Sequence, residues 1–295
     1  MNRITVGEIL VSATEHFRKH GIESARLDAE VLLAHVLGEE RIKLYVDYAK
    51  PLQNEEVAAY RRLVARRLQN VPVAYLVGYK EFNGVRFKVD RNTLIPRPET
   101  EHLVEAVCDY LNTCGESDER IVALDMCTGS GAIAISLALE FPNLSVVAVD
   151  ISTPALRVAR ENATALGVSD RVHFQRSDMF DRLPVDKLGE KFDAVVANPP
   201  YLSREEMRSL HPDIAKSEPL IALDGGSDGL RFQRVLVARA ADYLKPGGLL
   251  ALEIGASQGS EVAGMLQASG MYEGISILPD YAGLDRVVTA CKRLS

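Results

Sequence analysis

From about residue 118 onward, short apolar runs alternate with stretches of helical pattern, and this alternation constrains the fold more than any other feature. The runs are rich in Val, Leu, Ile and Ala, which is typical of strands buried on both faces of a parallel sheet. Strands that alternate with helices form βαβ units, so the sequence predicts a doubly wound α/β domain. The expected strands are 120–126, 145–151, 172–178, 192–198 and 247–255; the runs 274–280 and 286–292 predict a terminal hairpin with an antiparallel edge strand.

The first part of the chain has a different pattern. Residues 1–72 predict a small helical bundle whose first helix has a capping box from Thr5 to Glu8 and whose last helix is capped by Asn54. Residues 73–98 predict a β-hairpin around Asn83-Gly84 followed by a proline-rich connector, and 99–295 form the α/β domain. The last helix of the bundle carries a basic stripe, interpreted as a solvated face or as a docking surface for an acidic partner: Arg61, Arg62, Arg66 and Arg67.

The composition excludes several classes of function. The chain has 295 residues, 47% of them apolar, and a net charge of −7, which argues against an extended nucleic-acid surface. It has no 18-residue apolar run and no signal-peptide pattern, so we expect a cytoplasmic protein without a membrane span. We expect no metal site, because H-E-x-x-H is absent and the four cysteines lack zinc spacing: Cys108, Cys114, Cys127 and Cys291.

In open α/β sheets, ligands bind beyond the carboxyl ends of the strands. The first expected strand ends at Asp125-Met126 and leads into a glycine-containing loop before a helix: Cys127, Thr128, Gly129, Ser130 and Gly131. This loop lacks the third glycine of a dinucleotide fingerprint and the Gly-Lys-Ser/Thr of a phosphate loop. It is either a tight strand–helix turn or a loop that lets a ligand approach the backbone.

The next two expected strands also end in acidic residues. Asp150 is placed to accept both hydroxyls of a ribose, although a helix N-cap is the alternative role. Asp178, Met179 and Phe180 follow the third strand, where they would meet the edge and face of an adenine. Together with the loop, and without a nearby Lys or Arg, these residues indicate a bound nucleoside without phosphates. S-adenosylmethionine fits this description.

The fourth expected strand ends in Asn198, Pro199, Pro200 and Tyr201. The prolines stop the strand and stiffen the chain. The Asn198 side-chain oxygen and the Pro199 carbonyl can then accept both protons of a planar NH₂ group and raise the electron density on its nitrogen, while Tyr201 lies flat on the amide or ring. The combination predicts transfer of a methyl group from the cofactor to an amide or exocyclic amine; the alternative is a proline-rich turn.

With these motifs, the sequence resembles the N5-glutamine methyltransferases, and among them the enzymes that modify peptide chain release factors. The likeness spans nearly the whole chain and includes "RLDAEVLLAHVLG", "LIPRPETE", "TGSGAIAI", "NPPY", "EPLIALDGGSDGL" and "DYAGLDRVV". It implies a class I methyltransferase fold, S-adenosyl-L-methionine as cofactor, and the glutamine of the Gly-Gly-Gln motif in class-one peptide chain release factors as the target. The helical bundle would help to recognise the release factor.

The resemblance also implies roles for individual residues. Residues 128–131 would hold the methionine part of the cofactor, Asp150 the ribose and Asp178-Met179 the adenine. Cys127 and Asn198 would adjoin the cofactor, and Asn198 to Tyr201 would grip the glutamine. Arg97 and Glu99 would border the cofactor pocket. Cys127 stands where the family usually has a glycine, so we expect no positive φ there. "DMCTGSG" is instead similar to the sister enzymes that methylate a ribosomal protein of the large subunit, whereas "IPRPETE", "LEIGASQG" and "AGLDRVV" favour the release factor enzymes.

Other functions stay open at this stage. A DNA or RNA adenine or cytosine amino-methyltransferase shares the Asn-Pro-Pro-Tyr motif but would need a basic groove. A binding module without activity would tolerate loss of Asn198 or Asp150, and both are present. His211 belongs either to a lid over the substrate or to an exposed loop. Glu253 either faces the sulfonium or caps the following helix.

Overall fold

The computed structural model describes residues 4–113, 120–181, 183 and 191–294. The described part of the chain divides into two compact units, one of residues 1–79 and 211–217, the other of residues 80–210 and 218–295. Cys114 lies outside the described residues. Within the described residues, no helix has both the length and the apolar composition needed to cross a membrane.

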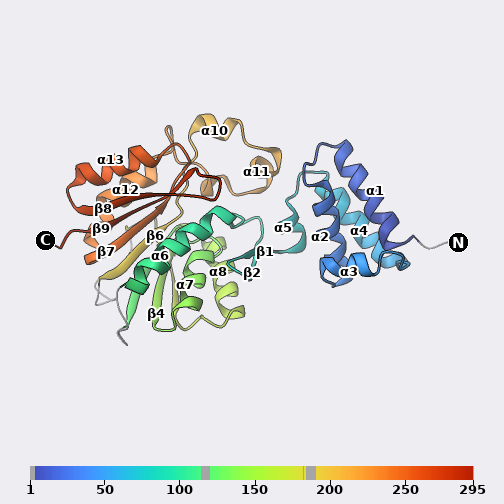
Figure 1. The fold of residues 1–295 in the computed structure, drawn as a ribbon, viewed down its shortest axis with the longest axis horizontal. Helices are drawn as coiled ribbons and strands as arrows, with labels where there is room; N and C mark the ends of the chain where they lie inside the picture. The colour runs from blue at the N-terminus through green and yellow to red at the C-terminus, as the bar shows by residue number, and fades with distance from the viewer. Residues whose placement is uncertain (1–3, 114–119, 182, 184–190, 295) are drawn as a thin grey trace. The chain divides into compact units, whose positions relative to one another are not determined.

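The first unit is a bundle of short helices around an apolar core (Figure 1). Its core helix α1 is amphipathic and begins with the expected capping box from Thr5 to Glu8. The helices are α1 (Val6–Lys19), α2 (Ala25–Leu37), α3 (Arg41–Val46), α4 (Asn54–Arg67), α5 (Val73–Val77) and α11 (Pro212–Ser217). Residues 73–77 therefore form a helix rather than part of a hairpin strand, and Gly78 ends it with a φ of 85°.

Two predictions for α4 are corrected. The N-cap is Gln53, not Asn54, and the Gln53 N–H donates to the Glu56 carboxylate at 2.7 Å. Arg67 does not belong to an exposed basic stripe, because its guanidinium is buried between Asp28 at 2.7 Å and Asp213 at 2.8 Å. Asp213 comes from α11, so a segment more than a hundred residues later in the sequence supplies one of the two anions that neutralise Arg67.

The second unit begins with the hairpin β1 (Tyr79–Phe82) and β2 (Val85–Lys88), which turns at Asn83 and Gly84 with positive φ at both residues. Its remaining elements are η1 (Pro98–Thr100), α6 (Glu101–Thr113), β3 (Ile121–Met126), α7 (Ala132–Glu140), β4 (Leu144–Asp150), α8 (Thr153–Ala165), β5 (Val172–Arg176), β6 (Phe192–Ala197), α10 (Arg204–Arg208), η2 (Leu220–Ala222), α12 (Arg231–Arg239), η3 (Ala240–Asp242), β7 (Leu244–Glu253), α13 (Gly259–Ser269), β8 (Tyr272–Pro279) and β9 (Asp285–Lys292).

Seven strands of the described residues form one sheet in the order β5-β4-β3-β6-β7-β9-β8, which confirms the predicted doubly wound fold. β3, β4, β5, β6 and β7 are parallel, and β9 is antiparallel to β7. The predicted terminal hairpin with an antiparallel edge strand is confirmed: β9 pairs antiparallel with both β7 and β8, and β8 forms the edge. β9 consists of buried and half-buried residues, whereas β8 has a mostly exposed pattern suited to an edge.

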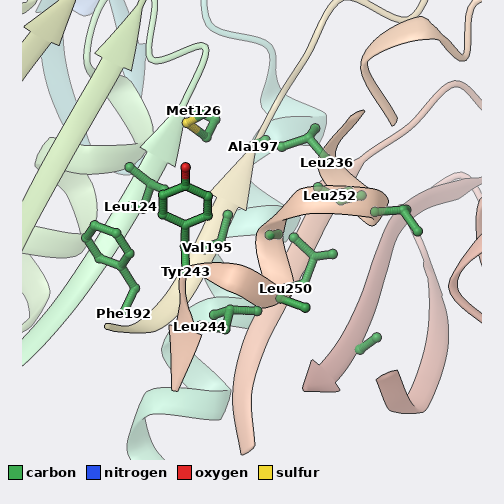
Figure 2. Close-up of a cluster of buried hydrophobic side chains, with 14 of the residues drawn as sticks. Leu124, Met126, Phe192, Val195, Ala197, Leu236, Tyr243, Leu244, Leu250 and Leu252 are labelled. Atoms are coloured by element: carbon green, nitrogen blue, oxygen red, sulfur yellow. The ribbon is translucent and has the colours of Figure 1, made fainter. Parts of the chain in front are cut away.

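Helices cover both faces of the sheet, with α6, α7 and α8 on one face and α12 and α13 on the other (Figure 1). Figure 2 shows Leu124, Val195 and Leu250 from neighbouring strands in the core under α12 and α13. The alternate residues of the same strands, such as Ala123 and Val196, belong to the opposite core. The strands are thus buried on both faces, which explains their nearly continuous apolar runs. The chain continues from β3 to β4 on one side of this pair and from β6 to β7 on the other side. The connections after β3 and β6 therefore diverge and leave a crevice at the carboxyl ends of these two strands.

Candidate functional site

A pocket lies at this reversal point, next to the carboxyl ends of β3, β4, β5 and β6. Its empty volume, including the open mouth, is about 940 Å³. The lining consists of Asn92, Thr93, Leu94, Met126, Cys127, Gly129, Val149, Asp150, Ile151, Ser152, Ala155, Ser177, Asp178, Met179, Asn198, Pro200, Pro219, Ile221, Ala222, Arg231 and Phe232. It therefore brings together seven of the sequence-derived site residues: Cys127, Gly129, Asp150, Asp178, Met179, Asn198 and Pro200.

The loop after β3 is more strained than expected. Cys127 has a φ of 63°, which corrects the prediction that this position needs no positive φ. A side chain in this left-handed region costs roughly 1–2 kcal/mol, and such strain is typical of functional loops. Met179, across the pocket, also has a positive φ, of 46°, and its sulfur lies 4.0 Å from the Cys127 sulfur. Both sulfur-containing residues thus adopt unusual backbone conformations in the loops after β3 and β5, the strands on either side of β4.

The other loop residues shape the pocket from behind. Thr128 and Ser130 are buried, and the Thr128 hydroxyl donates to the Asp125 carboxylate at 2.6 Å. The Ser130 carbonyl accepts from the Asn162 side chain at 2.9 Å. Gly131 has a φ of 83° and packs against α8, where a Cβ would lie 3.2 Å from the Cβ of Ala159. In the described part of the chain, these three residues do not line the pocket but hold Gly129 against it.

Asp125 is a buried carboxyl beneath this loop. One of its oxygens accepts from Thr128 and from the Ala134 N–H, and the other has no hydrogen-bond partner among the described residues. Burial raises the pKa of Asp125 to about 7, against the opposing effect of these hydrogen bonds. Asp125 therefore ties the loop to the first turn of α7.

Asp150 holds the loop from the neighbouring strand. Its Oδ2 accepts from the Gly129 N–H at 2.9 Å and its Oδ1 from the Ser152 N–H at 2.8 Å, while burial raises its pKa. Ser152 is the N-cap of α8, so Asp150 does not have that role. Each carboxylate oxygen has a further lone pair, and the side chain lines the pocket. Asp150 is thus an anchored acceptor that can receive hydrogen bonds from vicinal hydroxyls.

The residues after β5 separate into two environments. Asp178 and Met179 line the pocket. Phe180 does not line it in the described structure; its ring stacks on Tyr243 with a centroid distance of 4.7 Å in the buried core. The prediction that Phe180 meets the ligand is therefore corrected, because the positive φ of Met179 sends the following residue back into the core.

The Asn-Pro-Pro-Tyr segment follows β6 directly. The Asn198 Nδ2 donates to the Thr100 hydroxyl at 3.1 Å, which leaves its Oδ1 as the free end of the carboxamide. Pro200 lines the pocket, whereas Pro199 is buried behind it. The Tyr201 hydroxyl donates to Glu253 Oε1 at 3.3 Å, and burial raises the pKa of Tyr201 above its usual range, so the phenol stays protonated.

Two glycines of a later loop, Gly225 and Gly229, pack closely against the Asn-Pro-Pro-Tyr segment. This role was not assigned from the sequence. Gly229 has a φ of 77°, and a Cβ there would collide with the Tyr201 carbonyl. A Cβ on Gly225 would lie 2.8 Å from the Tyr201 Cα. The Gln258 side chain donates to the Tyr201 carbonyl at 2.9 Å and to that of Gly229 at 3.3 Å. The quoted motifs "GGSDGL" and "LEIGASQG" contained the signal, since isolated glycines mark close backbone approach.

The remaining candidates lie elsewhere. Arg97 pairs with the buried Glu218 at 2.6 Å, and Glu99 is exposed; neither lines the pocket in the described structure. His211 is exposed and belongs to the first unit. Glu253 is buried beside Tyr201, while the N-cap of the next helix is Gln258. Sequence reasoning also missed the lining residues around Asn92 and Arg231, because no local pattern shows which loops fold over a strand end.

Comparison with known proteins agrees with this geometry. Residues 8–78 match the PrmC N-terminal domain family, and residues 117–269 match a methyltransferase domain family. The release factor glutamine methyltransferase of Rhodopirellula baltica is 41% identical over 288 residues, covering 98% of this chain and 96% of the relative. That of Moorella thermoacetica is 42% identical over 290 residues, covering 98% and 99%.

Among solved structures, the N-terminal domain of human METTL16 in complex with SAH is 15% identical, with a TM-score of 0.50, and covers 72% of this chain and 76% of that domain. At this identity the likeness concerns the fold alone. The relatives match this chain across both units and over nearly their full length. The chain therefore belongs to the release factor glutamine methyltransferase family.

Proposed function

We propose that this enzyme uses S-adenosyl-L-methionine to methylate the side-chain nitrogen (N5) of the glutamine in the Gly-Gly-Gln motif of class-one peptide chain release factors. The observation that carries the proposal is that Asn198 and Pro200 line the same pocket as Gly129, Asp150 and Asp178. The side chain that would accept an amide proton and the residues that would hold a nucleoside thus line one cavity. The names of the relatives support the release factor as the protein that is modified.

The chemistry of the pocket fits the cofactor. Asp150 supplies the anchored acceptor for ribose hydroxyls, and Asp178 with Met179 supplies a polar edge and an apolar surface for the adenine. Cys127 to Gly131 would hold the methionine part, with Thr128, Ser130 and Gly131 acting through the loop that they shape. The acidic side chains suit a cationic ligand better than one with phosphates. When bound, S-adenosylmethionine would supply a methyl group on a sulfonium.

The Asn-Pro-Pro-Tyr segment would act on the substrate amide. The free Oδ1 of Asn198 and the carbonyl of Pro199 would accept its two protons, and the prolines would keep these oxygens in place. The Tyr201 hydroxyl is committed to Glu253, so its ring rather than its hydroxyl would contact the amide. Asn198 and Pro199 would thus hold the amide nitrogen as the acceptor of the methyl group that bound S-adenosylmethionine would supply, and one amide proton would leave to water when the nitrogen is methylated.

Mass spectrometry of two incubated proteins tests the proposal. A class-one release factor and a large-subunit ribosomal protein that carries a candidate glutamine are each treated with enzyme and S-adenosylmethionine. We expect one added methyl on the Gly-Gly-Gln glutamine and none after Asn198→Ala, while calorimetry shows that this variant still binds the cofactor. Methylation of the ribosomal protein alone would favour the resemblance of the Cys127 loop to the sister enzymes. Methylation of neither would refute the proposed substrate.

A further inference from the structure

Glu253 is a buried carboxyl that the proposed reaction does not use. It ends β7 directly behind the Asn-Pro-Pro-Tyr segment, and its side chain is 0% exposed. Its Oε1 accepts from the Tyr201 hydroxyl at 3.3 Å, and its Oε2 has no hydrogen-bond partner among the described residues. A buried carboxylate costs several kcal/mol unless it is compensated, so its presence at this position points to a role at the site.

Thr100 connects this carboxyl to Asn198. Thr100 is 4% exposed, and its hydroxyl accepts from the Asn198 Nδ2 at 3.1 Å. Burial raises the pKa of Glu253, and interaction with the Thr100 side chain opposes this shift. A hydroxyl has one hydrogen to donate and two lone pairs. Thr100 can therefore accept from Asn198 and give its single hydrogen toward Glu253.

The direction of the Asn198 carboxamide depends on this arrangement. The oxygen and NH₂ ends of a carboxamide have nearly the same shape, so only the polarity of a partner decides which end faces it. An ionised carboxylate only accepts hydrogen bonds. If Thr100 donates to Glu253, then Thr100 must accept from Asn198, and the Asn198 oxygen is left for the pocket.

We propose that Glu253 is a positioning residue that acts through Thr100 to orient Asn198, so that its oxygen rather than its NH₂ group meets the substrate amide, while also holding Tyr201 by its hydroxyl. The inference rests on the proposed function, in which Asn198 accepts a proton of the glutamine amide. With the carboxamide reversed, two NH₂ groups would face each other and the substrate nitrogen would lose an acceptor.

We call the proposed action of Glu253 on Asn198 through Thr100 the relay, and it depends on the charge of Glu253. Burial raises the pKa of Glu253 to about 7; Thr100, Arg286 and Tyr201 oppose this shift and Glu99 adds to it. Arg286 forms its ion pair with Asp280 at 3.1 Å. A protonated Glu253 can donate to Thr100 and so permit the reversed arrangement. The rate of methyl transfer should therefore rise with pH through about 7 as Glu253 ionises.

Steady-state kinetics of three variants with a class-one release factor test the relay. Glu253→Gln replaces an acceptor by a donor, and Thr100→Val removes the hydroxyl between the two residues. Both should lower kcat about 100-fold, as expected for one positioned polar group, with KM for the release factor and Kd for S-adenosylmethionine nearly unchanged. Thr100→Ser keeps the hydroxyl and should retain kcat. The pH dependence of kcat near 7 should disappear in Glu253→Gln.

The outcomes separate the two proposals. If the unaltered enzyme transfers no methyl group to the release factor, the proposed function fails and the relay fails with it. If the unaltered enzyme is active and Glu253→Gln keeps its kcat and its pH profile, the relay alone is overturned. Loss of cofactor binding in Glu253→Gln, or an increase in KM with unchanged kcat, would also overturn it, because either result indicates a structural or docking role.

Discussion

Replacing Gly131 by alanine should damage both the stability of the enzyme and its cofactor site. Gly131 has a φ of 83°, where a Cβ costs roughly 1–2 kcal/mol. The added Cβ would also lie 2.9 Å from the Ile135 side chain and 3.2 Å from the Ala159 Cβ. Overpacking of this kind costs about 1–3 kcal/mol, so we expect the variant to lose about 2–5 kcal/mol of unfolding free energy.

Gly167 provides a matched control in the same unit. It has a φ of 73°, but no described heavy atom lies within 4 Å of a Cβ built there. Gly167→Ala should therefore lose only the backbone part, about 1–2 kcal/mol. For a chain of this size 1 kcal/mol corresponds to a Tm shift of about 2–4 °C. Thermal denaturation followed by circular dichroism should show a drop in Tm for Gly131→Ala that is at least about twice the drop for Gly167→Ala.

The same pair of variants separates stability from binding. A displaced Gly131 would move the Gly129 N–H away from Asp150, which it meets at 2.9 Å. Such a charge-assisted hydrogen bond contributes about 1.5–3 kcal/mol, so the affinity for S-adenosylmethionine should fall at least about tenfold. Calorimetry should find unchanged affinity in Gly167→Ala. Equal Tm shifts in both variants, or full affinity in Gly131→Ala, would refute the packing argument.

Three other outcomes test further parts of the structure. Cys127→Gly should be more stable than Cys127→Ala by about 1 kcal/mol, because only glycine is relaxed at a φ of 63°; thermal denaturation that ranks alanine first would contradict the left-handed conformation. Burial raises the pKa of Asp125 from 3.8 to about 7, so the folded chain keeps a proton that the unfolded chain releases. The stabilisation that Asp125 contributes to the unfolding free energy should fall as pH rises from 3.8 to about 7. Urea titrations should therefore show a shallower fall of unfolding free energy with pH in Asp125→Asn than in the unaltered enzyme. An equally steep fall in both would contradict the raised pKa of Asp125. Arg67→Met should cost about 3–5 kcal/mol because two carboxylates lose their cation, whereas the exposed Arg61→Met should cost under about 0.5 kcal/mol; similar losses of Tm would exclude a buried ion network.

Local patterns explain why much of the fold was predictable. The apolar runs of the sheet, the capping box at Thr5 and the turn at Asn83-Gly84 depend on residues close together in the chain. The strand-end residues Asp150 and Asn198 were identified for the same reason, since strands in a parallel sheet end at a common edge. The prediction was wrong where two local readings compete, as in residues 73–77, whose apolar run forms a helix rather than a strand.

The amino-acid sequence by itself determined the order and type of the elements and the loop residues at the strand ends. Tertiary structure decided which buried groups stand behind those loops. Thr100 meets Asn198 although they are 98 residues apart, and Glu253 reaches Tyr201 across 52 residues. The positive φ of Cys127 was likewise imposed by packing, in spite of the cost of its Cβ. Periodicity and capping act over a few residues, whereas burial, ion pairing and the direction of a carboxamide are set by distant segments that only the folded sheet brings together.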